Sequence, residues 1–180
     1  MPAAGQEGCV RLFHGISLLC LCFLAGFAVE APAQAPAAKL LRKEPTMTRH
    51  AEGSFEVKNK LLEADEATTG TPIGRFGLDK QFRGDLDATS KGEMLSAGGP
   101  AKGTAGYVAI EHVTGTLNGH RGAFALQHFG TMEGGSFKLS VAVVPGSGSG
   151  ELAGITGTMT IIIAAGKHSY TFDYTLPATP

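Results

Sequence analysis

Apolar and polar residues alternate along two runs that flank an Asn-Gly pair near the middle of the chain. The first run, YVAIEHVTGTL, covers residues 107–117, and the second, HRGAFALQHFGT, covers residues 120–131. A period of two with many β-branched and aromatic residues is typical of strands. Asn-Gly between two such runs is a strong hairpin signal, because a type I′ turn needs positive φ at both central residues. The pattern predicts a β-hairpin that turns at Asn118 and Gly119.

The turn also sets which side chains share a face of the hairpin. With a two-residue loop Leu117 faces His120, and a four-residue loop over 118–121 keeps the same parity. Side chains alternate along a strand, so the bulkier apolar face, which we place inward, carries Tyr107, Ala109, Glu111, Val113, Leu117, Phe124, Leu126 and His128.

Two polar residues fall on this inward face. Glu111 and His128 come within cross-strand reach of each other, whereas a three-residue loop without a bulge would separate them. A carboxylate beside an imidazole can build a general acid–base site. The same pair can also be a structural hydrogen bond that joins two strands, and both interpretations stay open.

The rest of the chain alternates in the same way and shows no helix-period stripe after residue 45. Further strands are predicted at 48–57, 75–82, 86–95, 136–144, 158–164 and 168–176, with a long polar loop over 59–74. About eight short strands with short connections favour an all-β fold, an antiparallel closed barrel, with a β-sandwich as the alternative. An eight-stranded barrel leaves an interior for side chains or one small ligand. We expect a single domain over 48–177.

The N-terminus follows a different pattern. Arg11 precedes an apolar run at 16–29, and small residues follow it, which is the layout of a secretory signal peptide. We expect a signal peptide and cleavage region over 1–37, cut after Ala33 or Ala37, and a flexible tether over 38–47; an uncleaved anchor is the alternative. The prediction is an exported protein, periplasmic or secreted, without a stable membrane anchor after cleavage.

Composition narrows the chemistry of the exported part. All three cysteines lie at positions 9, 20 and 22, inside the predicted signal peptide, so thiolate and disulfide chemistry are excluded for the mature domain. Removal of Arg11, Glu7 and Glu30 changes 15 basic and 16 acidic residues to 14 and 14. A nearly neutral domain argues against a nucleic-acid partner.

Several segments together are similar to a known family. FRGDLDATSKGEMLSAG, AGYVAIEHVTGTLNG, GAFALQHFGTM and VVPGSGSGELAGITGTM resemble the bacterial domain-of-unknown-function family 3224, over roughly Thr48 to Leu176. That family resembles the allene oxide cyclase barrels, which are calycin-like, eight-stranded and antiparallel with an apolar cavity. The resemblance therefore favours the barrel over the sandwich and implies no activity, because fold analogy does not transfer chemistry.

Other polar patterns have simpler interpretations. GSGSG at 146–150 matches the letters of a nucleophile elbow, but a strand-like segment follows it rather than a helix. Asp85 and Asp87 could act as paired carboxylates, although Asp85 follows a glycine at a bend and fits a turn cap better. The five mature histidines lack metal-ligand spacing. No cofactor and no metal site are predicted.

Three functional hypotheses follow. The leading one is a barrel that binds a small, largely apolar ligand, with pocket candidates Tyr107, Glu111, Phe124, Leu126, His128, Tyr170 and Tyr174. The second is a cofactor-free isomerase or cyclase for a hydrophobic substrate, with Glu111 and His128 as the catalytic candidates. The third is a structural barrel that forms homo-oligomers through the apolar outward face of the hairpin.

Overall fold

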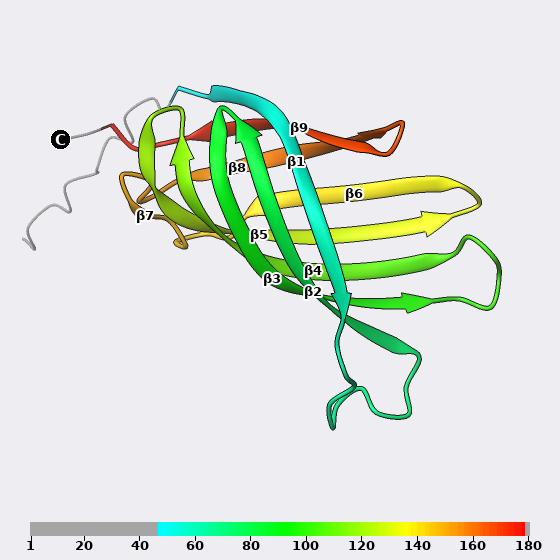
Figure 1. Ribbon diagram of the computed structural model, residues 1–180. Coiled ribbons are helices and arrows are strands. Elements are labelled where there is room, and N and C mark those ends of the chain that lie inside the picture. Colours follow the sequence, from blue (N-terminus) through cyan, green and yellow to red (C-terminus); the bar gives the residue numbers. More distant parts are fainter. Residues whose placement is uncertain (1–46, 179–180) are drawn as a thin grey trace, which may run out of the picture. The chain divides into compact units, whose positions relative to one another are not determined.

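The computed structural model describes residues 47–178, and every regular element in that part of the chain is a strand (Figure 1). The predicted signal peptide over 1–37, and the tether over 38–47 apart from Met47, lie outside the described residues. The strands are β1 (Arg49–Leu61), β2 (Ile73–Gly84), β3 (Leu86–Gly98), β4 (Ala105–Leu117), β5 (His120–Glu133), β6 (Ser136–Val143), β7 (Ser149–Gly150), β8 (Thr156–Ala164) and β9 (Lys167–Thr175).

The strands close into a barrel. The hydrogen-bonded order is β4-β3-β2-β1-β9-β8-β6-β5, and the pairing of β4 with β5 joins the two ends of that sheet. The short β7 adds an antiparallel bridge to β5 at Gly122 and Ala123. The protein is therefore an eight-stranded antiparallel β-barrel with one extra strand, and the predicted fold class is confirmed. The pairing between β6 and β8 is limited to Ala142 and Thr158.

The central hairpin has the predicted register. Leu117 pairs with His120 and Val113 pairs with Phe124, so the loop contains only Asn118 and Gly119. Both loop residues have positive φ, 46° and 84°, which is the backbone requirement that favours Asn-Gly at this turn. The even register keeps the predicted face together on the inside of the barrel.

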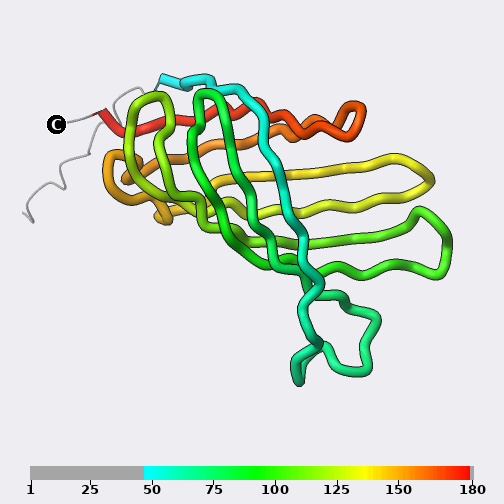
Figure 2. The backbone as a smooth tube through the Cα atoms, viewed as in Figure 1, coloured from blue at the N-terminus to red at the C-terminus, as the bar shows by residue number. Residues whose placement is uncertain are grey.

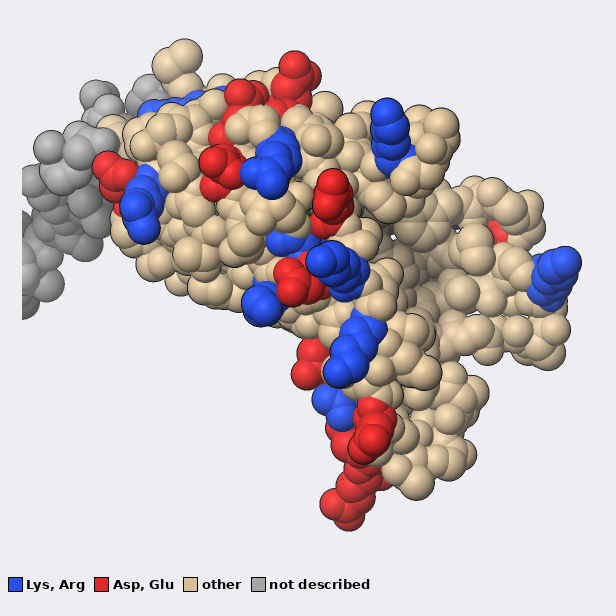
Figure 3. Space-filling model, in the orientation of Figure 1, with Lys and Arg blue, Asp and Glu red and all other residues tan. Residues whose placement is uncertain are grey.

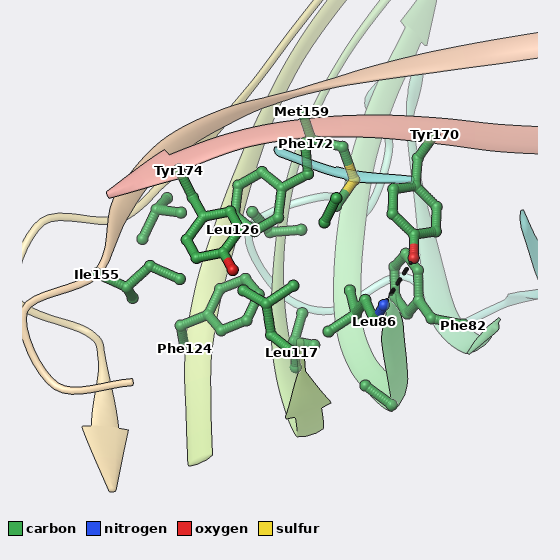
Figure 4. Close-up of a cluster of buried hydrophobic side chains, with 14 of the residues drawn as sticks. Phe82, Leu86, Leu117, Phe124, Leu126, Ile155, Met159, Tyr170, Phe172 and Tyr174 are labelled. Atoms are coloured by element: carbon green, nitrogen blue, oxygen red, sulfur yellow. Dashed lines mark hydrogen bonds between the residues drawn. The ribbon is translucent and has the colours of Figure 1, made fainter. Parts of the chain in front are cut away.

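One end of the barrel is filled by large side chains (Figure 4). Phe172 stacks between Phe124 and Tyr174, with ring centroids 5.8 and 5.3 Å away. The segment after β7 places Leu152 and Ile155, both almost fully buried, in the same cluster. Burial of side chains of this size contributes roughly 1.5–3 kcal/mol each, so this packed end is the main hydrophobic core.

The other end of the barrel is the mouth, where hairpins project. Figure 2 shows the turns around 99–104 and 134–135 extending away from the end that carries Asn118 and Gly119. Apolar side chains at these projecting ends are partly exposed, among them Phe137 and Ile163. In Figure 3 the projecting hairpins carry few charged side chains, and acidic and basic groups are intermixed over the rest of the visible face.

The connection between the first two strands is shorter than the sequence predicts. The expected loop over 59–74 is wrong at both ends, because β1 continues to Leu61 and β2 begins at Ile73. The last residues of β1 are all exposed and do not alternate in burial, so the period-two signal stops before the strand does. The loop that remains, 62–72, is fixed by Asp65, which accepts hydrogen bonds from the backbone and hydroxyl of Thr68.

Candidate functional site

A fully buried carboxylate lies inside the barrel between three hydrogen-bond donors. Oε1 of Glu111 accepts hydrogen bonds from Nζ of Lys80 at 2.7 Å and from Nε2 of His128 at 2.8 Å. Oε2 accepts a hydrogen bond from the hydroxyl of Ser90 at 2.5 Å. Lys80, Ser90, Glu111 and His128, here called the Glu111 cluster, come from the four consecutive barrel strands β2, β3, β4 and β5.

Local strand alternation explains why these polar groups point inward. Lys80 has the same parity as Leu78 and Phe82, and all three are buried. Glu111 lies between the buried Ala109 and Val113 in the same way. Because apolar neighbours on the same strand must face the core, the polar residue between them is carried inward as well.

The ammonium group of Lys80 is held against aromatic rings as well as against the carboxylate. Nζ lies 5.1 Å from the ring centroid of Phe55 and 5.8 Å from that of Phe82. These are cation–π distances, and such contacts strengthen where water is excluded. They help to keep a charged lysine stable in an environment that would otherwise penalise it.

The cluster keeps Glu111 ionised. Burial would raise the pKa of this carboxyl group, but the hydrogen bond from His128 and the positive charge of Lys80 outweigh burial and lower the pKa from 4.5 to about 2. An ionised carboxylate only accepts hydrogen bonds. His128 therefore donates its Nε2 proton to Glu111.

A cavity of about 130 Å³ opens above the cluster at the mouth of the barrel. Its walls are mostly apolar and include side chains from all eight barrel strands, whereas Lys80 and His128 supply charge and hydrogen bonds. The lining residues are Phe55, Val57, Asn59, Leu78, Lys80, Met94, Tyr107, Ala109, His128, Phe137, Leu139, Ile161, Ile163 and His168.

His128 lines this cavity and also the larger outer groove of the barrel. In the described part of the chain, no fully buried side-chain nitrogen or oxygen lacks a hydrogen bond. Nδ1 makes no hydrogen bond, while Nε2 is bonded to Glu111, so Nδ1 is not fully buried. His128 thus has a ring nitrogen that is partly accessible and makes no hydrogen bond in the described structure.

Tyr107 forms part of the rim of this cavity. Its ring stacks on Phe137 with centroids 6.5 Å apart and lies over Gly130, where a Cβ atom would be 2.2 Å from Cε1 of Tyr107. Burial and the nearby charge of Glu111 raise the pKa of the Tyr107 phenol, so this hydroxyl group stays protonated at neutral pH.

The structure brings some of the predicted site residues together and separates others. Tyr107 and His128 line the cavity, and Glu111 lies directly behind His128. The other four pocket candidates belong to the packed end of the barrel instead (Figure 4); they are Phe124, Leu126, Tyr170 and Tyr174.

The hydroxyl groups of the two core tyrosines make structural hydrogen bonds. Tyr170 accepts a hydrogen bond from the backbone N–H of Leu86 at 2.9 Å. Tyr174 accepts one from Nδ2 of Asn118 at 3.1 Å. Because one inward face runs the length of the barrel, alternation alone did not distinguish its packed end from its mouth.

Sequence reasoning missed Lys80 and Ser90. The available signal was parity, since Lys80 lies between Leu78 and Phe82, and Ser90 continues the buried series of Leu86 and Ala88. The contacts of Lys80 and Ser90 with Glu111 depend on the register of β2 with β3 and of β3 with β4. No local sequence pattern specifies these registers.

The remaining polar motifs have structural partners. Asp85 accepts a hydrogen bond from the backbone N–H of Glu52, and Ser147 accepts one from the N–H of Ala125, as expected for turn residues. His50 pairs with Asp173 on the surface at 2.8 Å. Among residues 47–178 no group of three or more His, Cys, Asp or Glu side chains is arranged to hold a metal ion, and no helix there is long and apolar enough to cross a membrane.

A larger groove of about 630 Å³ lies on the outside of the barrel. Outward residues of three neighbouring strands form its wall, with Leu95, Val108 and Phe129 in one register row. The charged groups at its edge are already paired, because Arg75 bridges Asp65 and Glu93 at 2.8 Å each. We take the inner cavity as the candidate site, because Lys80 and His128 of the Glu111 cluster line it.

Comparison with known proteins places the chain in a family without an assigned activity. No curated protein matches the chain. A solved structure of a protein of unknown function from Shewanella oneidensis MR-1 is 49% identical, with a TM-score of 0.67, over 73% of this chain and 100% of that chain. The family model described as "Protein of unknown function (DUF3224)" matches residues 51–174, and the chain therefore belongs to the DUF3224 family.

Proposed function

We propose that the protein is exported and that its barrel binds a small, largely apolar molecule in the cavity at its mouth. The observation that carries this proposal is the cavity itself, which is lined from all eight barrel strands and has Lys80 and His128 among otherwise mostly apolar walls. Concave apolar sites with a few polar groups that fix orientation are the usual form of small-molecule sites.

The size of the cavity limits the ligand. A volume of about 130 Å³ is close to that of an engineered apolar cavity of roughly 150 Å³ that accepts benzene. The ligand is therefore a single ring or a short aliphatic chain, with any longer part extending out of the mouth past Tyr107 and Phe137.

Ligand binding is tested with a neutral apolar probe and a matched pair of variants. Toluene should perturb the methyl NMR signals of Leu139 and Ile161, which line the cavity. Ala109→Leu fills the cavity and should abolish the effect. Val108→Leu, one residue away on the outer face, should leave it intact. A protein that binds no toluene, and that carries no small molecule in native mass spectrometry after purification from its own cells, contradicts the proposal.

Export is tested separately by the N-terminus of the protein recovered from cells. Cell fractionation should find the protein outside the cytoplasm, with a mature chain that begins at Gln34 or Ala38. Full-length protein retained in the cytoplasm would contradict export without affecting the ligand proposal.

A second candidate function is cofactor-free isomerisation of a small hydrophobic substrate. The observation that favours it is that Glu111 binds His128 through Nε2, while Nδ1 makes no hydrogen bond in the described structure and His128 lines the cavity. A histidine oriented by a carboxylate in this way can act as a general base. Nδ1 would take a proton from carbon next to a carbonyl group, and the same imidazolium would return it to another atom of the resulting enolate.

This second function has a direct assay. In heavy water, wild-type protein should speed deuterium exchange at the carbons next to the carbonyl group of cyclohexanone. Both His128→Gln and Glu111→Gln should lose that acceleration, because the first removes the base and the second its orienting carboxylate. Exchange that is equally fast in wild type and in Glu111→Gln would rule out this mechanism.

A further inference from the structure

We propose that the ligand is a weak organic acid, a small apolar body with one carboxyl group, bound by Lys80 and His128 together with one proton. This inference rests on the proposed ligand-binding function and names the chemical class that the site takes. It follows from the hydrogen-bonding capacity that the Glu111 cluster leaves unused.

The first part of the argument is an excess of donors. An ammonium group has three donor protons, and the one hydrogen bond of the Lys80 side chain in the described structure is to Glu111. The Lys80 ammonium group also makes cation–π contacts with the rings of Phe55 and Phe82. Glu111 already accepts three hydrogen bonds, so an acceptor from outside the cluster can satisfy the remaining N–H groups of Lys80.

The second part is the position of the two groups that would bind the ligand. Lys80 and His128 both contact the same oxygen, Oε1 of Glu111, and both line the cavity. They are therefore close neighbours in its wall. A carboxyl group has two oxygens on one carbon and can engage both neighbours, one oxygen accepting from Nζ of Lys80 and the other meeting Nδ1 of His128.

The third part is charge balance in a site with little water. Lys80 and Glu111 form a neutral ion pair, so a bare carboxylate would add an uncompensated negative charge, which is costly in such a site. A carboxylic acid brings its own proton, which moves from the acid oxygen to Nδ1 and gives a carboxylate beside an imidazolium. The charges of Lys80, Glu111, His128 and the ligand then add up to zero. A ligand that is ionised in solution must therefore bind with uptake of one proton.

The titratable neighbours of His128 allow this proton to be assigned. On the strands packed beside β5, the inward face of β4 contributes Glu111 and Tyr107, and that of β6 contributes only apolar residues near His128. Across the barrel, β2 contributes Lys80 and β9 contributes His168, which stacks on Phe55 with ring centroids 5.0 Å apart. Lys80 and Glu111 pair with each other, so we assign the proton to His128, the histidine that is hydrogen-bonded to this pair.

The experiment compares benzoate with benzamide, which has nearly the same shape and no charge. Calorimetric titration of the purified protein at pH 6 should give binding of benzoate at least tenfold tighter than that of benzamide. Titrations in two buffers of different ionisation enthalpy should give uptake of about one proton per benzoate and none per benzamide. Where free benzoate is ionised and His128 is neutral, affinity for benzoate should fall about tenfold per pH unit.

Three variants identify the groups involved. Lys80→Met combined with Glu111→Gln replaces both charges by residues of similar shape, and should bind benzoate no better than benzamide while it still binds toluene. His128→Gln should lose proton uptake. His168→Gln, a histidine of the same cavity without a hydrogen bond to the cluster, should keep both the preference and the proton.

The outcomes separate the two proposals. If benzoate, benzamide and toluene all fail to bind, the ligand-binding function is wrong and this inference falls with it. If benzoate and benzamide bind equally, or benzoate binds without proton uptake, the function stands and the assignment of an acid ligand is overturned. Loss of proton uptake in His168→Gln but not in His128→Gln would overturn the role of His128.

Discussion

Gly92 and Glu111 lie directly opposite one another on β3 and β4, and the missing side chain of Gly92 makes room for the backbone of β4 and Cβ of Glu111. A Cβ atom on Gly92 would lie 2.1 Å from the backbone oxygen of Ile110 and 2.8 Å from Cβ of Glu111. Lys80 is on β2, so it must cross this same strand to reach Glu111, which is 31 residues further along the chain. A small residue on β3 at this point is therefore a condition for the ion pair.

Replacement of Gly92 by alanine should destabilise the barrel strongly. The closest atoms are backbone atoms, which cannot move aside, and overpacking of this kind costs about 3 kcal/mol or more. Urea unfolding measures the change. Gly98→Ala, on the same strand, is the matched control, because its Cβ would meet nothing closer than 3.8 Å; equal losses in the two variants would contradict the steric argument.

Lys80→Met should cost much more stability than the simultaneous loss of both charges. The single change leaves the fully buried Glu111 carboxylate without its cation, a penalty of roughly 3–5 kcal/mol. Addition of Glu111→Gln removes the unpaired charge and should recover most of the lost free energy of unfolding. Chemical denaturation of wild type, both single variants and the double variant will measure this. Additive losses would mean that the two residues are not coupled.

Stability should fall in acid partly because of Glu111. Its pKa is lower in the folded protein, about 2, than the ordinary value of 4.5, so the unfolded state binds the proton more readily. The contribution is complete above about pH 5 and disappears as the pH falls toward 2, and its size is about 3 kcal/mol. Denaturation at pH 2 to 6 should give a shallower pH dependence for Glu111→Gln than for wild type; parallel curves would contradict the assignment.

Gly130→Ala should change the rim of the cavity. The added methyl group would occupy the space of the Tyr107 ring, so the ring must leave Phe137 and toluene should bind differently, with a changed affinity in NMR titration. Gly106→Ala on the facing strand serves as the control, because its Cβ would lie 3.8 Å from the nearest atom. Unchanged ring signals of Tyr107 in Gly130→Ala would disprove this packing.

Asn118 should tolerate glycine better than alanine. Its φ of 46° is accessible to glycine without strain, whereas alanine pays about 1 kcal/mol more in this region. Both variants lose the hydrogen bond from Nδ2 to the Tyr174 hydroxyl. Thermal or urea unfolding should therefore rank wild type above Asn118→Gly and Asn118→Gly above Asn118→Ala, and equal stability of the two variants would contradict the turn-based explanation.

The sequence was most informative where partners are close along the chain. Asn118 and Gly119 fix the hairpin register, and that register places Glu111 and His128 on one inward face with a diagonal contact. Two strands and one turn are enough to determine this relationship. The strand pattern favoured a closed barrel of about eight strands with a sandwich as the alternative, and the family resemblance favoured the barrel over the sandwich.

The parts that sequence reasoning could not supply depend on distant pairings. Lys80 reaches Glu111 through the register of β2 with β3 and of β3 with β4, and several registers are compatible with each local pattern. The boundary between packed core and open mouth also depends on the whole barrel, because Leu152 and Ile155 enter from a segment outside the eight main strands. Phe124 and Tyr107 therefore look alike in sequence and occupy different ends.

The two ends of the barrel are filled unequally, because one end is packed with side chains and the other contains a cavity. Aromatic rings, Leu152 and Ile155 fill one end, whereas the cavity lined by Tyr107 and Phe137 lies toward the other end. For the proposed ligand, substitutions of Tyr107 or Phe137 should therefore change the association rate and the dissociation rate together. They should not disturb the packed core at the other end of the barrel.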